Sequence, residues 1–164
     1  MRFPPGYELI NQVLVTGGVL VQESHRIFRP HGLTDAQFNV LNVLGQHPAG
    51  LSQRELSEAL VVDRSNVTSL LDRMERHGWV RRRDHPADRR IHVVTLTPAG
   101  RRLWQKVLPG YLAAVAAVTA GCSAAELARV QVFLARLAGA VRTWGEGQGR
   151  GRSPSGLARR APST

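Results

Sequence analysis

The chain has 164 residues, 43% of them hydrophobic, which is the length and composition of one globular domain with a real core. Its 22 basic residues against 12 acidic residues give a formal net charge of +10, which indicates a polyanionic partner such as nucleic acid or an anionic membrane surface. The single cysteine, Cys122, excludes an intramolecular disulfide, and without a signal peptide or a run of about 18 apolar residues we expect a cytoplasmic protein and no membrane partner.

Helix starts can be read along this chain, because several periodic segments follow a residue whose side chain accepts hydrogen bonds from free backbone N–H groups. The pairs with the reciprocal capping-box spacing are Thr34 with Gln37, Ser52 with Glu55, and Ser123 with Glu126. Asp63 can cap a further helix, and Thr97 precedes Pro98, a residue favoured at the first helical position. The predicted order is helix 7–28, helix 35–46, helix 53–60, helix 64–77, hairpin 79–96, helix 98–119 and helix 124–144.

The chain from Gly145 onward is rich in Gly, Pro, Ser and Arg and poor in apolar residues. Such a composition buries too little apolar surface to offset the entropy of ordering. We therefore expect a disordered basic tail over residues 146–164, and we favour a passive solubilising role over an added affinity for DNA.

The segment from Leu51 to Val80 reads as a short helix, a tight turn and a second helix. Apolar side chains of the second helix recur at spacings of three and four and predict one buried stripe: Val67, Leu70, Leu71 and Met74. The side chains expected to point to solvent are Arg64, Ser65, Asn66, Thr68, Ser69, Asp72, Arg73 and Arg76. Asn can pair with adenine, Arg with guanine, and Ser or Thr with a base or a phosphate, so this face suits a major groove. An exposed helix that is merely polar is the alternative for this segment taken alone.

Two short β-type runs, 79–83 and 91–96, flank a loop that carries Arg89 and Arg90 at its tip. Guanidinium groups on such a hairpin suit phosphates or a narrow minor groove, although an ordinary charged hairpin has the same composition. The preceding run of arginines, 81–83, is expected to serve as strand and as backbone-contacting charge. A capped helix, a polar helix and an arginine-tipped hairpin in this order predict a winged helix-turn-helix.

At this point the chain resembles the MarR family of bacterial transcriptional regulators over residues from about 7 to 144. Residues 33–38 with 40–41 are similar to the family's second helix, residues 51–56 to its third, and residues 67–80 to its recognition helix and the start of the wing. Asp88-Arg89-Arg90 and the following segment 94–100 are similar to the family's wing and the start of the next helix. The resemblance implies a mostly α fold with a small β-hairpin, in which a winged helix-turn-helix domain is joined to N- and C-terminal dimerisation helices.

The resemblance also implies a homodimer on pseudo-palindromic double-stranded DNA, with the recognition helix in the major groove and a wing arginine in the adjacent minor groove. By position that arginine is Arg90, and Asp88 would brace it through a charge-assisted hydrogen bond. The candidate DNA-binding residues are therefore Arg64, Ser65, Asn66, Thr68, Ser69, Arg73, Asp88, Arg89 and Arg90.

The last helix carries a heptad-like seam made of Leu127, Val130, Leu134, Leu137, Val141 and Trp144. Packing within the subunit explains part or all of this seam, and a second copy of the chain is the other candidate to cover it. We divide the chain into a helical dimerisation region at 1–30 and 98–145, a winged helix-turn-helix domain at 31–97, and the tail at 146–164.

Small aromatic or phenolic effectors are implied by the resemblance, in a cleft between the dimerisation helices and the DNA-binding lobe. Asn11, His25, Trp104 and Tyr111 are candidate lining residues, but packing explains each of them equally well, so none is assigned. The six histidines show no metal-binding spacing, so we expect no metal and no cofactor.

The favoured function is a ligand-responsive repressor that acts as a homodimer on a palindromic operator. A nonspecific or architectural DNA-binding protein without effector response is the alternative, since charge alone supports it. We expect no enzyme, because the sequence shows no nucleophile–base pattern and no phosphate-binding loop.

Overall fold

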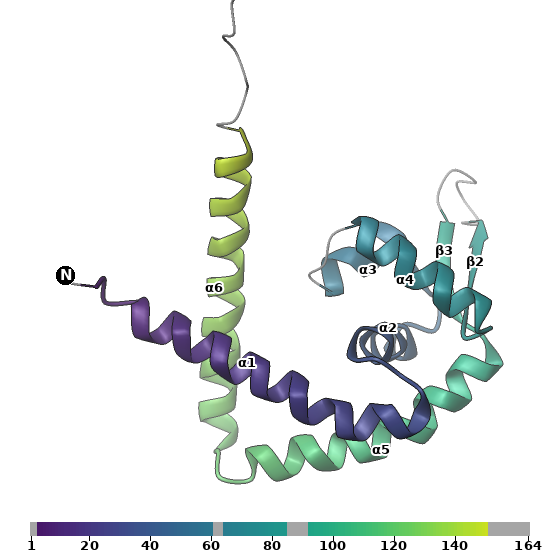
Figure 1. Cartoon of the computed structure of the whole chain (residues 1–164), viewed down its shortest axis with the longest axis horizontal. Helices are drawn as coiled ribbons and strands as arrows, with labels where there is room; N and C mark the ends of the chain where they lie inside the picture. Colours follow the sequence, from purple (N-terminus) through teal and green to yellow (C-terminus); the bar gives the residue numbers. More distant parts are fainter. Residues whose placement is uncertain (1–2, 61–63, 85–91, 151–164) are drawn as a thin grey trace, which may run out of the picture. The chain divides into compact units, whose positions relative to one another are not determined.

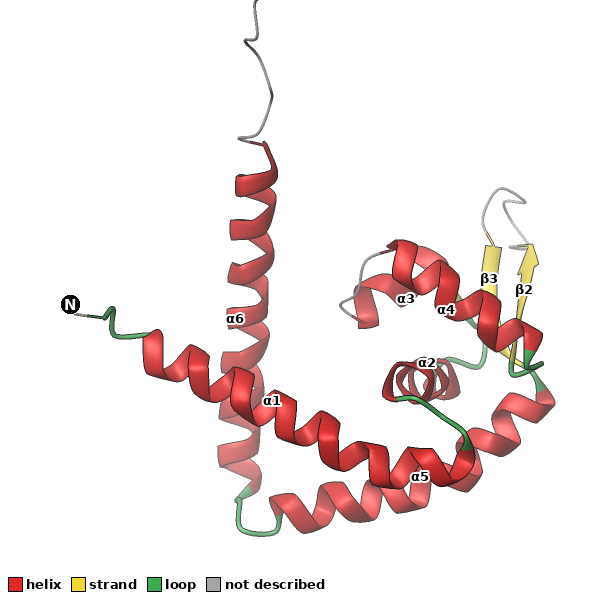
Figure 2. Cartoon of the chain, in the orientation of Figure 1, coloured by secondary structure: helices red, strands yellow, loops and turns green. Residues whose placement is uncertain are grey.

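The computed structural model describes residues 3–60, 64–84 and 92–150 (Figure 1). The helices are α1 (Tyr7–Phe28), α2 (Asp35–Gln46), α3 (Gln53–Leu60), α4 (Arg64–Arg76), α5 (Pro98–Thr119) and α6 (Ala124–Arg150), and a 3₁₀ turn, η1 (Arg29–His31), follows α1. The strands are β1 (Leu51–Ser52), β2 (Val80–Asp84) and β3 (His92–Leu96). The expected mostly helical fold with a small hairpin is confirmed (Figure 2).

Side-chain caps set several of the helix starts, as the sequence predicts. At α2, Gln37 N donates to Thr34 Oγ1 at 3.2 Å, and Thr34 N donates to Gln37 Oε1 at 2.9 Å. At α5, Gly100 N donates to Thr97 Oγ1 at 3.0 Å. These bonds satisfy N–H groups that have no partner within the helix. Asp63, the cap expected for α4, lies outside the described residues.

Helix α6 is longer than the sequence predicts. Its capping box is present, with Ser123 N donating to Glu126 Oε2 at 2.8 Å and Glu126 N donating to Ser123 Oγ at 3.3 Å. The predicted end at residue 144 is wrong, because the helix continues to Arg150 through the first residues of the expected tail. Glycine costs a helix only about 1 kcal/mol per residue, and the next helix-breaking proline is Pro154.

The strands form an antiparallel sheet in the order β1-β3-β2. Val80 pairs with Leu96 and Asp84 pairs with His92, while Leu51 of β1 pairs with Val94 on the other edge of β3. The hairpin was predicted and β1 was not, because a strand of this length shows no alternation of its own. Pairing to β1, which directly precedes α3, fixes the hairpin against the start of that helix.

The core lies in the first of two compact units, which divide between Ala117 and Val118. Its buried apolar side chains are Phe28, Leu33, Phe38, Val40, Leu41, Leu44, Leu56, Val67, Leu70, Leu71, Met74, Val80, Val94, Leu96 and Val107. Helix α2 contacts α1, α3, α4 and β3 and lies at the centre of this unit (Figure 1). The predicted apolar stripe of α4 is confirmed, and its burial leaves the opposite face of α4 at the surface.

No single helix in the described ranges is both long and apolar enough to cross a membrane. The residues of α5 and α6 meet that length and composition only when they are taken together.

Candidate nucleic-acid interface

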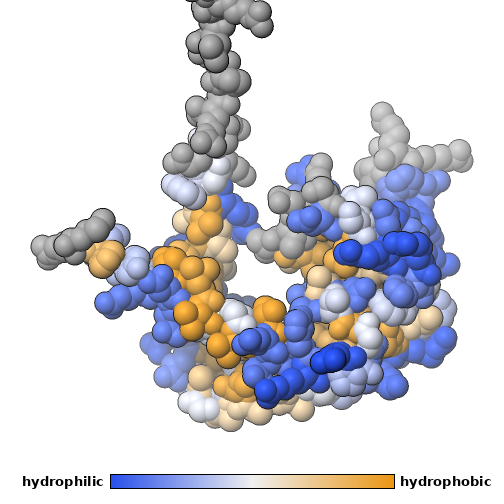
Figure 3. Space-filling view, viewed as in Figure 1, coloured by the Kyte–Doolittle hydropathy of each residue, from blue (hydrophilic) through white to orange (hydrophobic). Residues whose placement is uncertain are grey.

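The exposed face of α4 is polar and lies beside the hairpin. Asn66, Thr68, Ser69 and Arg73 are all exposed on this helix. In a space-filling view the surface over α4, β2 and β3 is hydrophilic, whereas apolar surface is visible along α1 (Figure 3). Short hydrogen-bonding side chains on one accessible helix face are the arrangement that base-edge recognition in a major groove needs.

Five of the nine predicted DNA-binding residues have side chains outside the part of the chain that the structure describes. Arg64 and Ser65 are the first residues of α4, but the positions of their side chains are not described. Asp88, Arg89 and Arg90 lie outside the described residues, in the connection between β2 and β3. The strands on either side of this connection are paired up to Asp84 and His92.

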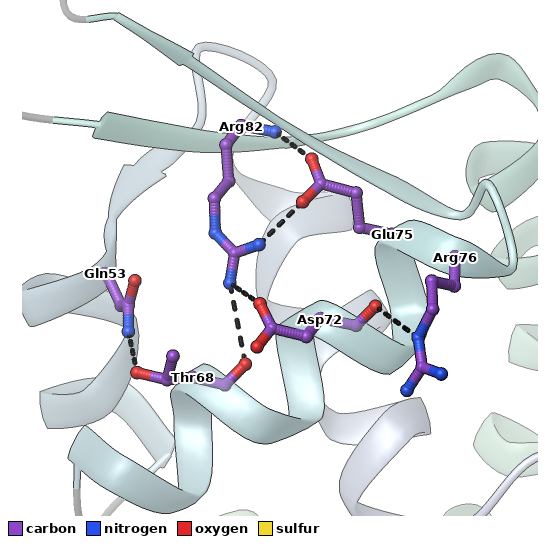
Figure 4. A network of polar contacts seen from close by, with 6 residues as sticks. All are labelled: Gln53, Thr68, Asp72, Glu75, Arg76 and Arg82. Carbon is purple, nitrogen blue, oxygen red and sulfur yellow. Dashed lines mark hydrogen bonds and ion pairs between the residues drawn. The ribbon is translucent and has the colours of Figure 1, made fainter.

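Arg82 joins the hairpin to α4 (Figure 4). Its Nη1 lies 2.6 Å from Glu75 Oε2 and its Nη2 lies 2.6 Å from Asp72 Oδ1. The Arg82 backbone N–H also donates to Glu75 Oε1 at 2.9 Å, so this carboxylate binds both the strand backbone and the side chain. Only 22% of the Arg82 side chain is exposed, and such charge-assisted, partly buried bonds are stronger than those of a surface ion pair.

Burial disfavours the charged form of Arg82, but the hydrogen bonds that it donates to Asp72 and Glu75, and the negative charges of these two carboxylates, outweigh burial and raise the arginine's pKa. The guanidinium therefore stays positive at every physiological pH. Its charge is used inside the protein, which distinguishes it from Arg81 and Arg83, whose side chains are exposed on the same strand.

The sequence interpretation missed this role of Arg82. The sequence predicts strand and backbone-contacting charge for all three arginines, 81–83. Asp72 is exposed as predicted, but its ion pair with Arg82 was not expected. The signal was present in the alternation of the strand, since Arg82 lies two residues after the buried Val80 and pairs with the buried Val94. An arginine on the core-facing side of a strand requires an acidic partner nearby.

Gln53 is a second residue that the sequence interpretation did not select. It is the first residue of α3, and its Nε2 donates to Thr68 Oγ1 on α4 (Figure 4). The carbonyl oxygen of Thr68 in turn accepts from Arg82 Nη2 at 3.5 Å. Helix α3, helix α4 and strand β2 are thus linked through polar contacts on one flank of α4.

The candidate effector-lining residues have other contacts. Trp104 packs against the core and its Nε1 donates to Asn42 Oδ1 at 3.3 Å, while the Tyr111 ring lies 4.9 Å from that of Phe38. His25 pairs with Asp35, and Asn11 is exposed. Among the described residues, no cluster of three or more His, Cys, Asp or Glu side chains could hold a metal ion.

Comparison with known proteins identifies the family. The family model described as MarR family matches residues 31–91. The transcriptional regulator MosR of M. tuberculosis, solved in complex with DNA, is 32% identical, with a TM-score of 0.68 over 82% of this chain and 96% of that chain. The chain belongs to the MarR family.

Other similar proteins extend the comparison. The transcriptional activatory protein BadR of Rhodopseudomonas palustris is 39% identical over 49% of this chain and 47% of its own. The transcriptional repressor YetL of Bacillus subtilis is 34% identical over 56% of this chain and 55% of its own. The match spans about half the length of these curated relatives. CouR from Rhodococcus jostii RHA1, solved with p-coumaroyl-CoA, shares the fold at 23% identity and a TM-score of 0.75, over 84% of this chain and 96% of that chain.

Proposed function

We propose that this MarR-family chain is a transcriptional regulator that binds double-stranded DNA sequence-specifically in the cytoplasm. The observation that carries the proposal is the Arg82 contact, which holds the hairpin against α4 while the polar face of α4 stays exposed. A recognition helix and a wing must be held in a fixed relation if both are to enter adjacent grooves. The formal charge of +10 supports the same partner.

The side chains are assigned roles by their chemistry. Asn66 suits a bidentate contact with adenine, Arg73 a contact with guanine or phosphate, and Ser69 a base or phosphate contact. Arg64, Ser65 and Thr68 complete the α4 surface. Beyond β2, Arg90 enters the minor groove, Asp88 braces it, and Arg89 contacts the backbone.

A homodimer is the proposed assembly, with 1–30 and 98–145 as its dimerisation region and 31–97 as the DNA-binding domain. The seam of α6 is mostly exposed in the single chain: Val130 is 54% exposed, Val141 55% and Trp144 68%. Exposed apolar residues on α1, such as Leu14 at 68%, support the same assembly. A twofold dimer places its recognition helices about one DNA turn apart, roughly 34 Å, and so reads a palindrome.

Ligand-responsive repression is the proposed mode of regulation. A small aromatic or phenolic effector would weaken operator binding by changing the spacing of the two recognition helices. The p-coumaroyl-CoA complex of CouR and the repressor name of YetL support this proposal. BadR is named an activator, so activation is the other mode of regulation that a relative's name supports.

A competition titration tests the proposal against a nonspecific, architectural role. Labelled promoter DNA from the chain's own gene is held by the protein and challenged with excess random duplex. Retention supports the regulator, and equal loss to both duplexes supports the architectural protein.

Two substitutions test the roles. Arg90→Ala is expected to weaken binding to all sequences and to lower the salt slope by about 1, and Asn66→Ala to relax base preference at one position. The matched controls are exposed residues of α6 and α2: Arg129→Ala should leave the affinity and the salt slope unchanged, and Asn39→Ala should leave base preference unchanged. A footprint and salt slope that neither Arg90→Ala nor Asn66→Ala alters would overturn the site assignment.

A further inference from the structure

The hydrogen bond between Gln53 and Thr68 joins residues that are 15 positions apart, on the two helices of the helix-turn-helix. Gln53 is half-buried at the first position of α3. Its carbonyl oxygen accepts from Ser57 Oγ at 2.9 Å, and the capping bond from Ser52 N to Glu55 Oε2 at 2.7 Å fixes the helix start beside it. The donor therefore sits on backbone that is itself held in place.

Thr68 receives contacts from both neighbouring elements. Gln53 on α3 donates to its hydroxyl oxygen, and Arg82 on β2 donates to its backbone carbonyl (Figure 4). The buried stripe on the other side of α4 fixes the depth of the helix, but apolar packing is non-directional. The stripe also decides which face of α4 meets the core, and directional hydrogen bonds on its flank narrow the remaining rotation of the helix about its own axis.

We propose that Gln53 is a positioning residue for sequence discrimination, acting through Thr68 on the rotation of α4. The inference rests on the proposed function. Base-edge hydrogen bonds tolerate only a few tenths of an ångström, whereas phosphate contacts with long cationic side chains tolerate more. A small rotation of α4 therefore weakens binding to the preferred sequence more than binding to random DNA.

The test uses the full chain and a duplex enriched from a random library by the wild-type protein, with an unrelated duplex of equal length as reference. Gln53→Ala is expected to lower the ratio of the two affinities about fivefold to tenfold while affinity for the reference duplex stays unchanged. Thr68→Val should lower the ratio at least as much, because Thr68 is also assigned to DNA contact, and adding Gln53→Ala to it should cause no further loss.

Gln46→Ala is the matched control, because Gln46 is an exposed glutamine on α2 whose Nε2 donates to the Asn42 carbonyl of its own helix at 3.2 Å. It should leave the ratio unchanged. Circular dichroism on every variant identifies any that fails to fold. If Gln53→Ala fails to fold, Gln53→Asn, whose side chain is one methylene shorter than that of glutamine, replaces it.

Each outcome has one meaning. If wild type does not distinguish the duplexes, the proposed function is wrong. If wild type distinguishes them and Gln53→Ala does so equally, the positioning role of Gln53 is wrong. Equal loss of affinity for both duplexes in Gln53→Ala, or additive losses with Thr68→Val, would show a structural or phosphate-contacting role and would also overturn the inference.

Discussion

Arg82 on β2 and Asp72 on α4 form an ion pair in which Nη2 lies 2.6 Å from Oδ1. The same guanidinium lies 2.6 Å from Glu75, one helical turn further along α4. One arginine therefore bridges two carboxylates of the helix that we assign to DNA recognition. The acidic pair also neutralises this positive charge within the protein, so the exposed arginines are the ones available for the proposed DNA contact.

Loss of the Arg82 side chain should loosen the hairpin from α4. Arg82→Ala leaves two carboxylates without their shared partner, and we expect the free energy of unfolding to fall by about 1–2 kcal/mol. Urea unfolding followed by circular dichroism measures the change. Arg81→Ala, which removes an exposed arginine from the same strand, should cost less than about 0.5 kcal/mol. Equal effects of the two substitutions would show that the bridge adds no stability.

Gly100 has no room for a side chain where α5 passes the end of α4. A Cβ at this position would lie 1.9 Å from the backbone oxygen of Trp79, so helix and strand would have to separate. Gly100→Ala should destabilise the protein by about 1–3 kcal/mol, read from its thermal unfolding midpoint. Gly17→Ala is the control, since nothing lies within 4 Å of its Cβ in α1. The free energy of unfolding of the control should rise by up to about 1 kcal/mol. An unchanged unfolding midpoint in Gly100→Ala would contradict the close contact between Gly100 and Trp79.

The stabilisation that the capping box gives to α6 should be lost at acid pH. Hydrogen bonds from the Ser123 hydroxyl and backbone N–H lower the pKa of Glu126 below its usual 4.5. A lowered carboxyl pKa means that the cap stabilises the helix above pH 4.5 and that this contribution is lost as pH falls through the lowered pKa. An NMR titration of the Glu126 side chain should show a midpoint below 4.5, and Ser123→Ala should move it upward. A midpoint at or above 4.5 in the wild type would contradict the cap.

A charge on the α6 seam should separate the proposed dimer. Val130→Glu puts a carboxylate into the apolar seam of both subunits, and the dimer dissociation constant should rise at least about tenfold. Sedimentation velocity over a range of concentrations measures it. Val132→Glu is the control, because Val132 is 71% exposed but lies off the seam. Identical sedimentation of wild type and Val130→Glu would exclude this seam as the interface.

Much of the fold was predictable because its signals are local. Thr34, Ser52 and Ser123 each have a capping partner within one turn, so the starts of α2, α3 and α6 could be read directly. The stripe ending at Met74 needs only the periodicity of one helix. The polar face of α4 follows from that stripe, since the side opposite a buried face is the exposed one.

The features that were missed depend on contacts between distant segments. Strand β1 forms because Leu51 pairs with Val94 of β3. The strand has only two residues, which is too short for a sequence pattern to predict it. The partner of Arg82 depends on the register of the hairpin and on the angle between β2 and α4. The end of α6 at Arg150 depends on small propensity differences between glycine and its neighbours, which local rules resolve poorly.

Selection from a library of random duplexes is the most direct test of sequence-specific recognition by α4 and the wing. Wild-type protein is incubated with the library in the presence of excess random competitor, and the retained duplexes are sequenced. We predict enrichment of a pseudo-palindrome whose half-sites lie about one helical turn apart. Retention of duplexes without any enriched sequence would contradict the account and would show a protein held to DNA by charge alone.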